Sequence, residues 1–181
     1  DFATKFLKLA KSDKNIVSFI FLLRQKRFMW RLKMDSGNIG FVLLCAAFVF
    51  VMTPGLAMFY GGLVRKKNVV NTMMTSIFII GVGIVMWVLF GYSLSFAPSG
   101  NAFIGDFRWL GLEGVSLTEG YTDDASIPNM VFSAFQMMFA VITPALITGA
   151  VAGRMKFKSI FVFTIFWSLI VYYPLAHMVW G

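Results

Sequence analysis

The chain has 181 residues, of which 59% are hydrophobic, and a formal net charge of +8. Its mean hydropathy is +0.78, and it contains 21 phenylalanines and 12 methionines. A soluble domain of this length cannot bury so much apolar surface, so the composition excludes an ordinary soluble globular protein and indicates a membrane protein.

The positive charge is concentrated at the start of the chain. Residues 1–33 hold nine of the 16 cationic side chains against Asp1 and Asp13, which leaves a net charge of +7 on this segment. The chain as a whole is therefore not expected to bind nucleic acid. We expect Met34 to be the natural start and residues 1–33 to be a basic, non-native extension. The alternative is a basic amphipathic helix that lies on anionic lipid.

Long uncharged segments follow this basic start, at residues 36–64, 68–105, 125–153 and 159–181. Each is longer than the roughly 20 residues that a helix needs to cross the hydrocarbon core of a bilayer. Strands of a membrane barrel have only about 10 residues and alternate in polarity, and a backbone in lipid must satisfy its own hydrogen bonds. The expected fold class is an all-α integral membrane protein embedded in a lipid bilayer.

We predict four transmembrane helices and one long loop within residues 34–181. The helices are expected at about 37–64, 69–96, 127–153 and 158–181, and the loop at about 97–126. The first helix carries small residues at Gly40, Ala47, Gly55 and Gly62, close to two turns apart, which predicts one face that another helix can approach closely. Pro54 should bend this helix.

The charges of the loops predict an orientation. Loops 65–68 and 154–158 carry six cations and no acidic residue, so both belong in the cytoplasm. The long loop carries five acidic residues against Arg108 alone, and it belongs outside. Residue 34 then lies outside as well, where a strongly basic extension contradicts the positive-inside rule and weakens the case that residues 1–33 are native.

The sequence shows no residue pattern that is typical of catalysis or metal binding. The predicted helices contain no Asp or Glu, no His and Cys set with metal-ligand spacing, and no phosphate-binding glycine loop. We therefore expect no enzyme activity, no cofactor and no metal site. The single cysteine, Cys45, is expected to pack as a small apolar residue.

Ordered blocks along the chain resemble the ammonium transporter family, which includes Amt, Rh and Mep proteins. The blocks are MTPGLAMFYGGLVRKKN at 52–68, GYSLSF at 91–96, AFQMMF at 134–139 with GAVAGRMKF at 149–157, and YPLAHMVWG at 173–181. The resemblance covers essentially all of 34–181. It implies the first third of a fold of about eleven helices, so this piece alone is expected to be inactive.

The resemblance implies an ammonium transporter or channel that recruits ammonium at an outer aromatic site and passes ammonia or ammonium through an apolar pore. Family members are expected to form homotrimers, and many prokaryotic members are inhibited by a cytosolic nitrogen-regulatory PII protein. The alternative is an ammonium sensor or membrane interaction protein of the same family that performs no net transport.

The positions that match the family's recruitment site are Trp180, Phe139 and Phe135. Aromatic faces attract a cation within about 6 Å of the ring centroid by roughly 0.5–2 kcal/mol. The residues alone leave open ordinary packing of the two phenylalanines and an interfacial place for Trp180. Gln136 is expected to join helices rather than bind substrate. The matching histidine of the family is not one of its pore histidines, so His177 is expected to be structural.

Overall fold

The computed structural model describes residues 34–98, 101–122 and 125–181 of the chain. The basic segment 1–33, with both interpretations of it, lies outside the described residues. The described part contains four helical stretches that are long and apolar enough to cross a membrane: Ser36–Leu63, Lys66–Phe96, Asn129–Val151 and Phe157–Trp180. The prediction of an all-α protein with four membrane-spanning helices is confirmed.

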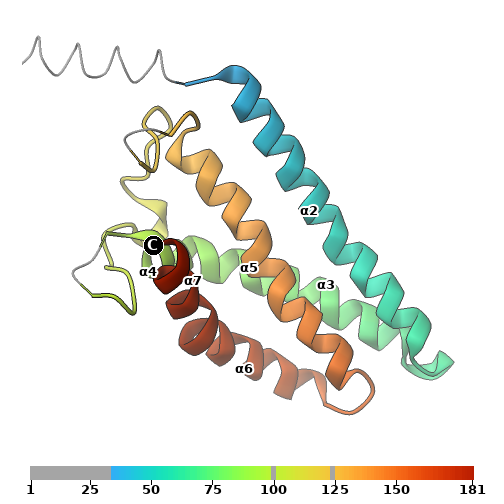
Figure 1. Cartoon of the computed structure of the whole chain (residues 1–181). Helices are drawn as coiled ribbons and strands as arrows, with labels where there is room; N and C mark the ends of the chain where they lie inside the picture. Colours follow the sequence, from blue (N-terminus) through green and yellow to red (C-terminus); the bar gives the residue numbers. More distant parts are fainter. Residues whose placement is uncertain (1–33, 99–100, 123–124) are drawn as a thin grey trace, which may run out of the picture.

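Helix α2 (Ser36–Leu63) runs along one side of the bundle, next to helix α5 (Asn129–Val151) (Figure 1). The Asp35 carboxylate accepts a hydrogen bond from the Gly37 amide at 2.9 Å and thereby caps the start of α2. Pro54 lies inside α2 without interrupting it.

The face of α2 that packs against the bundle is not the one predicted. Its buried residues are Ala46, Thr53, Ala57 and Gly61. A Cβ atom added at Gly40, Gly55 or Gly62 would meet nothing within 4 Å. Close packing of α2 within the described residues therefore uses a neighbouring stripe of small residues. The sequence does not distinguish the two stripes, because the members of each are separated by close to one or two helical turns.

The second and fourth stretches are not uniform α-helices. The second consists of η1 (Lys66–Asn68), α3 (Val69–Met86), the π-helix η2 (Trp87–Gly91) and α4 (Tyr92–Phe96). The fourth consists of α6 (Phe157–Trp167), the π-helix η4 (Ser168–Tyr172) and α7 (Tyr173–Trp180). Such wide turns change the direction in which the following side chains point, and the sequence analysis did not predict them.

The segments that follow the two π-helices pack against each other. A Cβ atom added at Gly91 would lie 2.7 Å from Cζ of Tyr173, so only a residue without a side chain leaves room for this ring. The Trp87 ring centroid is 6.1 Å from that of Tyr173. The resulting core holds Trp87, Tyr92, Phe96 and Tyr173, which are almost completely buried.

Helix α5 joins α2 to α3. The Tyr60 ring packs directly on Gly149, and the Tyr60 hydroxyl donates a hydrogen bond to the Leu146 carbonyl oxygen at 3.0 Å. On the other side of α5, the hydroxyls of Ser76 and Thr148 are 3.3 Å apart. Polar groups of this kind hold helices together where lipid removes the hydrophobic drive.

The long loop between α4 and α5 is folded onto the ends of the helices and includes the turn η3 (Leu110–Leu112). The Ser93 hydroxyl donates to the Asp106 carbonyl oxygen at 2.6 Å and accepts from the Trp109 amide at 2.9 Å. The Tyr121 ring stacks on Phe132 at 4.9 Å, and burial raises the pKa of the Tyr121 hydroxyl.

The connections define two ends of the bundle. The long-loop end contains the described loop residues (97–98, 101–122 and 125–128), the start of α2 and the end of α7. A bond from the Asp35 amide to the Ser126 carbonyl oxygen at 3.1 Å joins the loop to the start of α2. The basic end contains loops 64–68 and 152–156 (Figure 1). There Nδ2 of Asn68 lies 3.4 Å from the position of a Cβ added at Gly153.

Candidate functional site

A cavity of about 580 Å³ lies between α5 and the stretch from α6 to α7. It is lined by aromatic, aliphatic and uncharged polar side chains from these four elements. They are Phe135, Gln136, Phe139, Thr143, Trp167, Tyr172, Leu175, Ala176, Val179 and Trp180. No side chain in this lining carries a formal charge, so any attraction for an ion must come from ring faces and dipoles.

All three residues that the sequence singled out line this one cavity. Phe135 and Phe139 project from α5 one turn apart, and their ring centroids are 5.1 Å apart at an interplanar angle of 80°. Trp180 reaches the cavity from α7 and is 59% exposed, while Phe139 is 37% exposed. The rings therefore have accessible surface to offer to a ligand, which fully packed core rings do not.

Two hydroxyl groups and a further aromatic pair, which the sequence analysis did not select, also line the cavity. Thr143 lies one turn beyond Phe139 on α5, and its hydroxyl donates to the Phe139 carbonyl oxygen at 2.6 Å. Trp167 and Tyr172 face it from α6 and η4, with ring centroids 6.0 Å apart. These residues lie deeper in the bundle than Trp180, since Tyr172 precedes it by eight residues on the same stretch.

The π-helix η4 explains why Trp167 and Tyr172 share the cavity. In a regular α-helix, residues five positions apart point in directions about 140° apart. A turn with i to i+5 hydrogen bonds brings them closer to the same side, and η4 begins directly after Trp167 and ends at Tyr172. A search for helical periodicity assigns the two residues to different faces. The periodicity of an α-helix does not reveal this π-helix.

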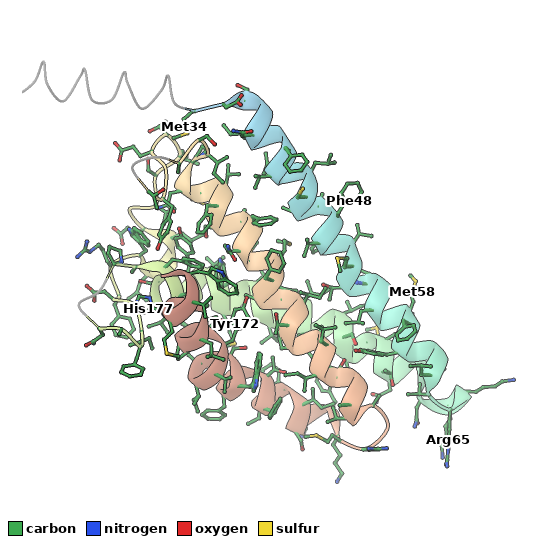
Figure 2. All side chains as sticks on the ribbon, viewed as in Figure 1. Met34, Phe48, Met58, Arg65, Tyr172 and His177 are labelled. Carbon is green, nitrogen blue, oxygen red and sulfur yellow. The ribbon has the colours of Figure 1, made fainter. Side chains whose placement is uncertain are left out.

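Gln136 and His177 occupy different surroundings. The Gln136 side chain is half-buried in the wall of the cavity. His177 is not among the residues that line the cavity. Figure 2 shows His177 on the side of the long loop and Tyr172 toward α5, consistent with the bonds from the His177 ring to Ser95 and Asn101.

The arrangement suits a small cation better than an anion or a metal ion. Ring faces present negative charge density to a cation, and the nearby amide and hydroxyl oxygens can replace part of its hydration. Among the described residues, no group of three or more His, Cys, Asp or Glu side chains is placed to hold a metal ion.

Comparison with known proteins gives this cavity its context. The model of the Ammonium Transporter Family matches residues 40–181. The chain belongs to the ammonium transporter family. The curated ammonium transporter of Bacillus subtilis is 49% identical over 148 residues, which cover 82% of this chain and 36% of the relative. That of Aquifex aeolicus is 42% identical over 151 residues, which cover 82% of this chain and 35% of the relative.

Solved structures agree with the family assignment. The crystal structure of Saccharomyces cerevisiae Mep2 matches with a TM-score of 0.74 and 34% identity, covering 84% of this chain and 36% of that one. The structure of Candida albicans Mep2 matches with a TM-score of 0.72 and 29% identity, covering 84% of this chain and 33% of that one. The chain thus spans about a third of the length of the relatives that it matches.

Proposed function

We propose that the protein to which this chain belongs is an ammonium transporter or channel, with Trp180, Phe139 and Phe135 forming its recruitment site for ammonium. Family membership supports the substrate class, since the relatives from Bacillus subtilis and Aquifex aeolicus are named ammonium transporters. The main observation that supports this site is that three aromatic residues, from two helices far apart in sequence, line one uncharged cavity.

The physical need for such a site follows from the cost of dehydrating an ion. A bare cation in a medium of low dielectric is strongly unfavourable, so a site must replace its water before the ion or its neutral form moves on. Each ring that faces the cation contributes about 0.5–2 kcal/mol. The half-exposed Trp180 and Phe139 can supply such faces, and the Gln136 amide oxygen in the same wall is a candidate hydrogen-bond acceptor.

The remainder of the path is proposed to be apolar. Beyond Phe139, the described lining consists mainly of aromatic and aliphatic side chains, with the hydroxyls of Thr143 and Tyr172 as the polar exceptions. An apolar passage favours transfer of ammonia over the charged ion, because the neutral molecule loses far less hydration energy. In this proposal, ammonium is selected at the aromatic rings and passes inward as ammonia or as a partly stripped ion.

We further propose a cell-membrane location with the basic end in the cytoplasm and the long-loop end, including residue 34, outside. The support is the cluster of six cations in the two short loops, which lie at the same end of the bundle. Assembly as a homotrimer and inhibition by a cytosolic PII protein are proposed from the family resemblance alone. A non-transporting ammonium sensor is the second candidate, and a C-terminal signalling domain encoded by the complete gene would favour it.

Uptake by the complete protein tests this function. The complete gene should restore uptake of labelled methylammonium to cells that lack ammonium transporters. Trp180→Leu should raise the half-saturation concentration, and Phe48→Leu, an exposed aromatic on α2, should leave it unchanged. An unaltered half-saturation concentration in Trp180→Leu counts against the recruitment site. Saturable binding without flux in purified, reconstituted protein favours the sensor. If the complete protein shows neither binding nor flux, the proposal is wrong.

A further inference from the structure

The basic end of the bundle carries exposed cationic side chains that no neighbouring carboxylate neutralises. Six of them come from the two short loops and the first turn of α6: Arg65, Lys66, Lys67, Arg154, Lys156 and Lys158. Figure 2 shows Arg65 pointing away from the helices. Among the described residues, every acidic side chain lies at the opposite, long-loop end. The positive charge of the basic end is therefore available to an anionic ligand.

An aromatic cluster lies where α6 leaves this end. The ring of Phe157, the first residue of α6, meets the ring of Phe78 on α3 edge to face, with centroids 5.0 Å apart. The ring of Phe161, one turn further along α6, lies 5.8 Å from the same Phe78 ring. Phe78 and Phe157 remain exposed, and none of the three lines the cavity of the candidate site. The cluster thus offers apolar surface away from the proposed substrate path.

The contact between Phe78 and Phe157 leaves part of α3 open on its basic side. Phe78 follows Val69, the first residue of α3, by nine residues, which is about 14 Å along a helix. About two turns of α3 therefore lie between the basic end and this contact. On these turns Val70 and Met74 are exposed, and they lie on the same face as Phe78 because they precede it by eight and four residues.

The cations lie directly beside this apolar surface. Lys156 and Lys158 flank Phe157 in the sequence, and Lys67 precedes the exposed face of α3 by one turn. Phospholipids combine a negative phosphate at the membrane surface with acyl chains directly beneath it. Lysines at this level attract anionic headgroups, and apolar side chains below them contact the chains. A free anion would use the cations alone, and an acidic protein would leave the aromatic surface uncovered.

We propose that the basic end binds an anionic phospholipid, with its phosphate between Lys156 and Lys158 and an acyl chain against Phe157 and Phe78. The site goes beyond the proposed function, since it lies apart from the cavity that holds the three candidate aromatic residues. The ligand belongs to the membrane leaflet that surrounds the basic end.

Binding of phosphatidylglycerol to the purified complete protein tests this proposal. Lipid-stripped protein in neutral detergent is immobilised, and its retention of labelled dioleoylphosphatidylglycerol is compared with that of dioleoylphosphatidylcholine, which has the same chains and no net charge. The anionic lipid should bind at least about fivefold more tightly, the ratio expected for one cation beside it. Raising the salt concentration from about 0.05 to about 0.5 M should reduce this preference, because exposed charges are screened.

Single lysine substitutions locate the headgroup. Lys156→Gln and Lys158→Gln should each weaken binding of phosphatidylglycerol by about fivefold and leave phosphatidylcholine unchanged. Arg108→Gln, which removes an exposed cation at the long-loop end, is the matched control and should change neither affinity. An equal effect of Arg108→Gln would show that the lipid responds to net charge alone, and the inference would be wrong.

A substitution in the aromatic cluster tests the place of the acyl chain. Phe157→Ala should weaken binding of both lipids by roughly 2- to 5-fold, because apolar surface is lost. Phe166→Ala, at an exposed ring elsewhere on α6, should not. Inorganic phosphate at the concentration of the lipid should fail to displace it, since phosphate has no chain. Displacement by phosphate would overturn the inference, as would equal effects of the two alanine substitutions.

The lysine variants remain decisive if Phe157→Ala fails to fold. Wild-type protein that binds the two lipids equally would contradict the proposal and leave the cations to another occupant, such as an acidic partner protein or another part of the complete protein. Unchanged affinity in both lysine variants would contradict it as well. No transport is measured here, so failure of the proposed ammonium transport and failure of this lipid site are read separately.

Discussion

The ring of Phe135 meets the ring of Phe139 edge to face on the wall of the cavity, with centroids 5.1 Å apart. The edge of an aromatic ring is positive and its face negative. This contact orients the two rings relative to each other while leaving Phe139 37% exposed. A ring held in this way offers a cation a face that needs little reordering on binding.

Phe139→Leu should therefore weaken recruitment more than Phe139→Tyr does. Leucine keeps the apolar volume but lacks the ring face, so about 0.5–2 kcal/mol of binding free energy is lost, or roughly a 2- to 30-fold higher half-saturation concentration. Tyrosine retains the face and should stay within about threefold of the wild type. Methylammonium uptake over a range of concentrations gives both values, and equal effects of the two substitutions would contradict a cation–π role.

Tyr172→Phe isolates the hydroxyl group at the inner part of the cavity. On the proposed path, the polar groups beyond the three outer rings are mainly those of Thr143 and Tyr172. We expect the maximum rate of uptake to fall by roughly 2- to 10-fold, the value of one hydrogen bond, with little change in half-saturation concentration. The control is Phe163→Leu, on the part of α6 that lines a different cavity. A change confined to the half-saturation concentration would assign Tyr172 to recruitment instead.

Gly149→Ala should destabilise the bundle because the added methyl group collides with the Tyr60 ring. Overpacking of this kind costs about 1–3 kcal/mol. Gly81→Ala, at a helical glycine with nothing within 4 Å, should be neutral or stabilising by up to about 1 kcal/mol. Thermal unfolding in detergent compares the two variants. Adding Tyr60→Ala to Gly149→Ala should recover part of the loss caused by the collision, and strict additivity of the two substitutions would argue against this contact.

Ser93→Ala should loosen the long loop locally. Its hydroxyl is fully buried and serves both the Asp106 carbonyl oxygen and the Trp109 amide. Leaving these groups unpaired costs about 1–3 kcal/mol. Hydrogen exchange should become faster at residues 105–112 and remain unchanged at the basic end, around residues 64–68. Uniform acceleration over the whole chain would instead indicate global destabilisation.

The fold class and the four membrane-spanning helices could be predicted from composition and charge. Uncharged apolar segments longer than a bilayer is thick can only be helices in lipid, which predicts the four spans. The ordered blocks around Gly61, Phe139 and Trp180 were specific enough to indicate the family. The sequence did not distinguish between the two small-residue stripes of α2, because a repeat of about two turns defines a face without saying what lies opposite it.

The sequence by itself therefore determined that the chain lies in lipid, how many spans it has and which family it belongs to. It also singled out Phe135, Phe139 and Trp180 as candidate site residues. Only the tertiary structure decided that these rings share one cavity with Trp167, Thr143 and Tyr172, and that His177 faces two carbonyl oxygens. The reason is physical. Hydropathy reports each segment's preference for lipid, which is a local property. The direction of each side chain depends on π-helices and on glycines that admit a ring from another helix, as Gly91 admits Tyr173.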